Sequence, residues 1–137
     1  MNEEQSEQTN MAIWAESTPY KPRIDEGKYP ATVEDVSVEW NQLGGFGKYN
    51  DVVTLRLKVD EVSLNHKIYC THRETGVLNL NTKKLREAVS SILGGEPTGK
   101  FDLKNLISKQ CEVWIIHVDG NNGNIYERVD KIRPAKM

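Results

Sequence analysis

One alternating stretch, residues 53–59, constrains the fold more than any other part of the sequence. Every second position carries an aliphatic side chain: Val53, Leu55, Leu57 and Val59. The positions between them carry polar or basic side chains: Thr54, Arg56 and Lys58. Because successive side chains of a strand point to opposite faces, this pattern predicts a strand with one apolar and one basic face. A glycine-rich loop with two aromatic residues and a lysine precedes this strand, so we expect the pair to form a binding surface.

One further strand is predicted before this stretch and one after it. The segment from Gly27 to Trp40 is a long first strand whose apolar phase slips at Glu34-Asp35, and a β-bulge explains such a slip. Residues 63–65, Ser-Leu-Asn, have turn composition, and residues 67–73 then form the third strand. If Ile68 and Cys70 of that strand face inward, its outward residues are Lys67, Tyr69, Thr71 and Arg73.

A single helix is expected over residues 79–93. Its apolar residues recur with helical spacing, Asn81 or Thr82 can cap its start, and Gly94-Gly95 ends it. Residues 102–107 then suggest a short helical turn capped by Asp102. Residues 111–118 form a strand that is apolar on nearly both faces and should be central or covered on both sides. A loop over 119–124 leads to a last strand over 125–132.

The order of these elements predicts the fold class. Three strands, one helix and two strands give a mainly β protein, a five-stranded OB-type barrel with the helix between strands three and four. An SH3-like barrel or a small sandwich stays open as an alternative. The OB-fold domain spans residues 23–137, and residues 1–22 form a flexible acidic N-terminal arm. Trp14 in this arm either anchors it to the domain, binds a partner or a second copy, or belongs to an arm that competes for the basic face.

Composition limits the classes of function. A net charge of −2 and a pI of about 5.9 argue against a polycationic nucleic-acid protein but not against a local basic face. No apolar run is long enough to span a bilayer and the first residues lack a signal pattern, so we expect a cytoplasmic protein without membrane contact. Cys70 and Cys111 have neither metal nor redox spacing, so no metal and no cofactor is expected.

Catalysis has little support in the sequence. The segment Gly44-Gly45-Phe46-Gly47-Lys48 lacks the spacing, the Ser or Thr and the following helix of a phosphate-binding loop. The adjacent carboxylates Glu34-Asp35 and Asp60-Glu61 point to opposite faces of their strands. We therefore expect a protein that is not an enzyme.

The expected binding surface combines aromatic and basic side chains, as single-stranded nucleic acid requires. The candidates for stacking on bases are Phe46, Tyr49 and Tyr69, with Trp40 as either a fourth or a core residue. The candidates for phosphate contact are Lys48, Arg56, Lys58, Lys67 and Arg73. The alternative for these cations is an ordinary solvated strand face.

The chain also resembles a known family in pattern. Gly27-Lys28-Tyr29-Pro30-Ala31, residues 101–107 before Cys111-Glu112-Val113, and residues 126–134 resemble the small OB-fold single-stranded DNA-binding proteins of phage and mobile-element replication modules. Ser108 stands where that pattern has glycine, and an acidic C-terminal tail is missing. The resemblance covers about residues 25–135 and implies binding of single-stranded DNA in DNA replication or recombination, with replication or recombination proteins as partners.

A second hypothesis uses the same barrel differently. The loop aromatics and Trp14 would then form a protein interface, and the chain would be an accessory or structural protein of a phage or mobile element, or an inhibitor of a host factor. Unprotected strand edges are compatible with a homo-oligomer in either case.

Overall fold

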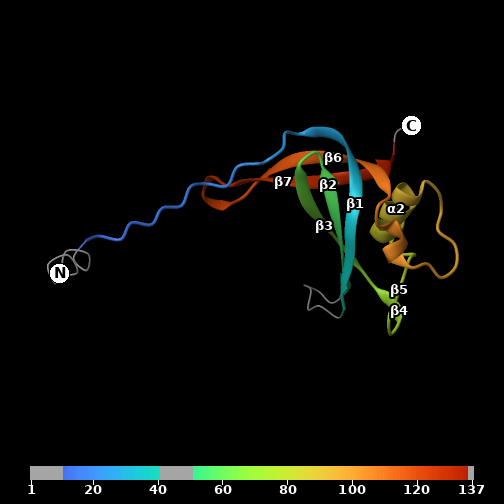
Figure 1. Cartoon of the computed structure of the whole chain (residues 1–137). Coiled ribbons are helices and arrows are strands. Elements are labelled where there is room, and N and C mark those ends of the chain that lie inside the picture. The colour runs from blue at the N-terminus through green and yellow to red at the C-terminus, as the bar shows by residue number, and fades with distance from the viewer. Residues whose placement is uncertain (1–10, 41–50, 136–137) are drawn as a thin grey trace, which may run out of the picture.

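The computed structural model describes residues 11–40 and 51–135 and shows a mainly β protein (Figure 1). One α-helix is present among these residues. The elements in chain order are β1 (Gly27–Glu39), β2 (Asp51–Val59), β3 (Val62–Cys70), β4 (His72–Glu74), β5 (Val77–Leu78), α2 (Lys83–Leu93), the 3₁₀ turn η2 (Leu103–Leu106), β6 (Gln110–Asp119), the 3₁₀ turn η3 (Asn121–Gly123) and β7 (Ile125–Pro134).

Five of the strands form one antiparallel sheet in the order β3-β2-β1-β6-β7. The two short strands β4 and β5 form a separate hairpin. The sequence predicts five strands with the helix directly after the third, but the β4–β5 hairpin intervenes. In chain order α2 therefore follows the fifth strand, while among the strands of the large sheet it lies between β3 and β6.

The predicted alternation of β2 and the predicted bulge of β1 are both confirmed. Val53, Leu55, Leu57 and Val59 are each at most 1% exposed, whereas Arg56 and Lys58 face solvent. The β1–β2 register shifts between Val33 and Asp35, so Glu34 is the extra residue of the bulge. The bulge keeps Val33 and Val36 both inside although they have opposite parity.

The turn between β2 and β3 lies earlier than predicted. Val59 pairs with Val62, so Asp60 and Glu61 form the turn, and Ser63, Leu64 and Asn65 belong to β3. Asp60 adopts a left-handed φ of 54°, a conformation that aspartate tolerates better than most residues. The strand starts early because the buried Leu64 side chain pairs with Leu57 and adds to the core.

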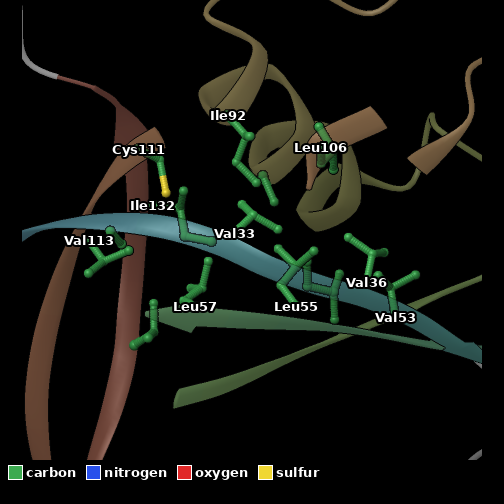
Figure 2. Packing of buried hydrophobic residues seen from close by; sticks show 14 of the residues in the cluster. Val33, Val36, Val53, Leu55, Leu57, Ile92, Leu106, Cys111, Val113 and Ile132 are labelled. Carbon is green, nitrogen blue, oxygen red and sulfur yellow. The ribbon is translucent and has the colours of Figure 1, made fainter. Parts of the chain in front are cut away.

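The core is a single cluster between the inner face of the sheet, α2 and η2 (Figure 2). Helix α2 begins at Lys83 rather than near Asn79, and left-handed Gly94 is its C-cap. Thr82 occupies the N-cap position, but its side chain makes no capping hydrogen bond. Its buried face contributes Leu85, Ala88, Val89 and Ile92. The predicted cap of η2 is confirmed, since the Asp102 carboxylate accepts a hydrogen bond of 2.9 Å from the Lys104 backbone N–H.

Ser108, just before β6, has a left-handed φ of 75°. Its backbone N–H donates a 2.7 Å hydrogen bond to the Val33 carbonyl, and the Val33 N–H donates to the Lys109 carbonyl. These two bonds tie the loop before β6 to the bulge of β1. A glycine would adopt this backbone conformation without steric cost. This explains why the family pattern described above has glycine at the position that Ser108 occupies here.

The chain before β1 is held on the β6–β7 hairpin by a cluster that we call the Tyr20 clasp. It consists of Tyr20, Arg23, Asn124, Tyr126 and Glu127. The Tyr20 ring stacks on Tyr126 at 5.1 Å, and its hydroxyl donates a 2.6 Å hydrogen bond to Glu127 Oε1. Arg23 Nη2 lies 2.9 Å from the same oxygen, and the Glu127 side chain is only 4% exposed.

The chain before Pro19, from residue 11 on, extends away from the body of the protein (Figure 1). The Ile13 and Trp14 side chains are 94% and 89% exposed, so Trp14 does not anchor the arm to the domain. No helix in the part of the chain that the structure describes is long and apolar enough to cross a membrane.

Candidate nucleic-acid interface

The outer face of β2 and β3 brings together four of the predicted binding residues. Tyr69 and Lys67 lie on β3, where they are paired with Val52 and Thr54, and Arg56 and Lys58 lie on β2, where they are paired with Asn65 and Ser63. All four residues are exposed, and Tyr69 is 54% exposed. Their inward neighbours Ile68 and Cys70 are buried, as predicted. From Tyr69 to Ser63 the row runs six residues, or roughly 20 Å along the strand.

The charge of this face is reduced at one point. Glu34 at the bulge accepts a 2.6 Å hydrogen bond from the Ser63 hydroxyl, and its Oε1 lies 3.4 Å from Arg56 Nε. Asp35 is opposite Arg56 in the β1–β2 register. Within the described residues Lys58 and Lys67 make no ion pair with a carboxylate, so they are the cations on this face most available to an external anion.

Arg73 does not belong to this face, contrary to the prediction. β3 ends at Cys70, and Arg73 lies on β4 in the separate hairpin. The sheet ladder stops because Thr71 turns to other partners: its carbonyl accepts from the Asn79 N–H at 2.8 Å, and its hydroxyl lies 3.3 Å from that of Thr82.

Arg73 instead lines a groove of about 1340 Å³ between β1, the β4–β5 hairpin and residues 97–104. The groove also contains Trp40 and Phe101. It is an aromatic and partly basic hollow at one end of the sheet. Acidic side chains line it as well, including Asp35, Glu74 and Asp102.

The three loop residues Phe46, Lys48 and Tyr49 lie outside the described residues. Trp40, at the start of that loop, is 38% exposed and is therefore neither fully core nor fully free. Its ring meets the ring of His72 edge-on, with centroids 6.3 Å apart. His72 Nδ1 in turn lies 2.7 Å from Asp51 Oδ2, and Asp51 is fully buried. The buried carboxylate thus holds His72, whose ring meets that of Trp40 beside the groove that Trp40 lines.

One aromatic and basic cluster was not anticipated from the sequence. Trp114 on β6 is paired with Lys28 on β1 and with Lys131 on β7. The two lysine Nζ atoms lie 5.3 and 5.4 Å from the centroid of the Trp114 ring, which is 39% exposed. β6 is central, as predicted, but its outer face is not covered at Trp114. The strand's nearly continuous apolar composition concealed this exposed position.

The two cysteines are free and buried. Burial, together with the neighbouring Asp51 carboxylate, raises the pKa of the Cys70 thiol to about 11, and burial raises the pKa of the Cys111 thiol to about 11. Thiols with such pKa values are poor nucleophiles and poor metal ligands. Within the described ranges, no three His, Cys, Asp or Glu side chains gather as a metal site.

No protein-family model and no curated protein matches this chain. Function is therefore inferred from the residues and the geometry described above.

Proposed function

We propose that the protein is a non-enzymatic, sequence-tolerant single-stranded DNA-binding protein of DNA replication or recombination, acting in the cytoplasm. One observation carries the proposal: the outer face of β2–β3 holds the exposed Tyr69 in line with Lys67, Arg56 and Lys58. Aromatic rings offer stacking to any base, and lysines and arginines contact the phosphates. Such a face needs no base-specific hydrogen bonds.

The order of the strands supports an OB-type barrel for this proposal. In an OB fold the third and fifth strands are the edges that approach each other when the sheet curls, and the helix lies between the third and fourth strands. The edges here are β3 and β7, and α2 lies between β3 and β6 in the chain. The face of the second and third strands is where OB folds bind oligonucleotides, and in this chain that face carries Tyr69 and its basic neighbours.

The test is a fluorescence-anisotropy titration of labelled oligo-dT at low and at moderate salt. Binding should weaken as salt rises, because each phosphate that a lysine or arginine neutralises contributes about 0.7 to the slope of log K against log salt. Tyr69→Ala should weaken binding by about 1–3 kcal/mol and leave the slope unchanged, because stacking releases no counterions.

The double variant Lys58→Ala/Lys67→Ala should weaken binding and lower the slope by about 1.4, for two phosphate contacts. Lys83→Ala/Lys109→Ala is the matched control, because it removes two exposed lysines outside this face. Absence of wild-type binding at low salt, or equal effects of the two double variants, would contradict the proposal.

A second candidate function is a protein-interaction module of phage or mobile-element origin. Met11, Ile13 and Trp14 favour it, because they are apolar and 65%, 94% and 89% exposed. If the arm binds a second copy of the chain, light scattering should show an oligomer whose mass falls to that of the monomer in the variant Trp14→Ala. If wild type and variant are both monomeric, self-association through Trp14 is excluded.

A further inference from the structure

The cluster of Lys28, Trp114 and Lys131 also lies on the outer side of the sheet, but on the strands β1, β6 and β7 rather than on β2 and β3. The three residues are in register on three adjacent strands, so they form a row across β1, β6 and β7. On β6 the residues before and after Trp114, Val113 and Ile115, point into the core. Because side chains alternate along a strand, Trp114 points outward. The interior strand β6 thus presents an indole ring that is flanked by one lysine from each neighbouring strand.

These two lysines have no carboxylate partner within the described part of the chain. The nearest outward acid on β6 is Glu112, which is paired in register with Arg133 of β7. Glu26, close to the start of β1, accepts a 2.7 Å hydrogen bond from the His117 backbone N–H. The lysines therefore rest on the indole, an interaction that is weak at exposed sites and easily exchanged for a phosphate.

We propose that this row is a second contact for single-stranded nucleic acid, with one base stacked on Trp114 and the flanking phosphates on Lys28 and Lys131. The inference rests on the function proposed above and extends it. Every base of a single strand has a phosphate on each side along the chain, which matches a ring between two cations. Base stacking on an indole is stronger than an exposed cation–π contact, so the lysines can leave the ring faces when a nucleotide arrives.

The two contacts are close enough to share one strand. Lys58 is paired with Thr32 of β1, and Lys28 lies four residues from Thr32 on the same strand. One strand spacing and four residues place the two lysine Cα atoms roughly 14 Å apart. At about 3.4 Å per stacked nucleotide, about four nucleotides bridge them. A strand of about three nucleotides, roughly 10 Å long, therefore cannot touch both contacts at once, whereas one of about 16 nucleotides reaches both, within the site sizes of OB folds.

The experiment compares oligo-dT of these two lengths on the full chain. Trp114→Ala should weaken binding of the long oligonucleotide by about 5- to 150-fold and leave the short one unchanged. Lys28→Ala/Lys131→Ala should lower the salt slope for the long oligonucleotide by about 1.4, and Lys83→Ala/Lys109→Ala should leave it unchanged. Trp114→Phe should retain part of the affinity and lose part of the tryptophan quenching on binding. Thermal unfolding checks that each variant is folded.

The outcomes separate the two proposals. If the wild type binds neither length, the proposed function and this inference both fail. If it binds both lengths and the Trp114 and lysine variants bind both equally well, only this inference is overturned. If those variants lose binding to a poly-glutamate peptide but keep full oligo-dT affinity, the row serves an acidic protein partner and the inference is equally overturned.

Discussion

Removal of the Glu127 carboxylate tests how the Tyr20 clasp is held. In Glu127→Ala, Tyr20 loses a hydrogen bond of 2.6 Å to a carboxylate, and Arg23 loses its interactions of 2.9 and 3.0 Å with the same group. A hydrogen bond to a charged group contributes about 1.5–3 kcal/mol. The Arg23 side chain is 52% exposed, so its ion pair is screened and contributes only about 0.2–1 kcal/mol. The docked state should therefore lose about 2–4 kcal/mol, because both contributions vanish together.

Amide hydrogen exchange followed by NMR measures this loss at two N–H groups. The Tyr20 N–H donates to Asn124 Oδ1 at 2.7 Å, and the Ile125 N–H donates to the Tyr20 carbonyl at 2.9 Å. Their protection factors should fall by about 30- to 700-fold, whereas core amides such as that of Leu57 should keep theirs. Tyr20→Phe is the control that removes only the hydroxyl and keeps the stack on Tyr126, and it should show a smaller fall.

The same clasp should open in acid. Burial tends to raise the pKa of Glu127, but the hydrogen bonds from Tyr20 and Arg23 outweigh burial and lower it. A carboxylate with a lowered pKa stabilises the docked state fully above its ordinary pKa of about 4.3, and this stabilisation is lost as pH falls through the folded pKa. Protection of Tyr20 should fall over that range in the wild type and not in Glu127→Ala. Unchanged protection in Glu127→Ala at neutral pH, or an equal fall at Leu57, would refute this account.

Three further predictions concern stability. Leu55→Ala should lower the free energy of unfolding by about 2–5 kcal/mol in urea denaturation, because Leu55 is 1% exposed in the core; a loss below about 1 kcal/mol would contradict its place there. Burial lowers the pKa of His66, and the positive charges of Lys84 and Arg128 lower it further. Stability should therefore fall as pH drops below about 6.5, where the unfolded chain binds the proton first, and less so in His66→Gln; equal pH profiles for the two proteins would contradict this. Ser108→Gly should raise the free energy of unfolding by about 0.5–1 kcal/mol, because relief of the left-handed strain exceeds the entropy that glycine adds to the unfolded chain. A lower free energy of unfolding in urea denaturation would show that serine is preferred there.

Local sequence patterns predicted the parts of the fold that depend on local geometry. The period-two pattern of residues 53–59 identified β2, and the phase slip at Glu34-Asp35 identified the bulge. The turn was misplaced because Ser63-Leu64-Asn65 has turn composition, whereas burial of Leu64 opposite Leu57 decided the structure. Composition carried no information on that pairing.

The candidate site was predictable only where neighbouring strands are also neighbours in the chain. Tyr69 and Arg56 could be placed on one face because β2 and β3 form a hairpin. Lys28 and Trp114 are more than 80 positions apart, and no periodicity within one strand indicates that they meet. Trp114 and Lys131 lie on the β6–β7 hairpin, but the register shifts between Trp114 and Ile115, which hides their pairing from the sequence. Arg73 was misplaced because side-chain and backbone bonds of Thr71 end the third strand early.

The two buried thiols make the chain well suited to site-specific chemistry. With pKa values of about 11, Cys70 and Cys111 are thiolate in only about one molecule in 10,000 at pH 7, whereas an ordinary exposed cysteine is thiolate in a few per cent. A cysteine introduced at Asn65 on β3 or at Pro30 on β1, two exposed positions beside the proposed contacts, would therefore react with maleimide roughly hundreds of times faster than the native pair. Single-site labels on the two outer faces could then report which nucleotides of one bound strand lie at each face, without removal of either native cysteine.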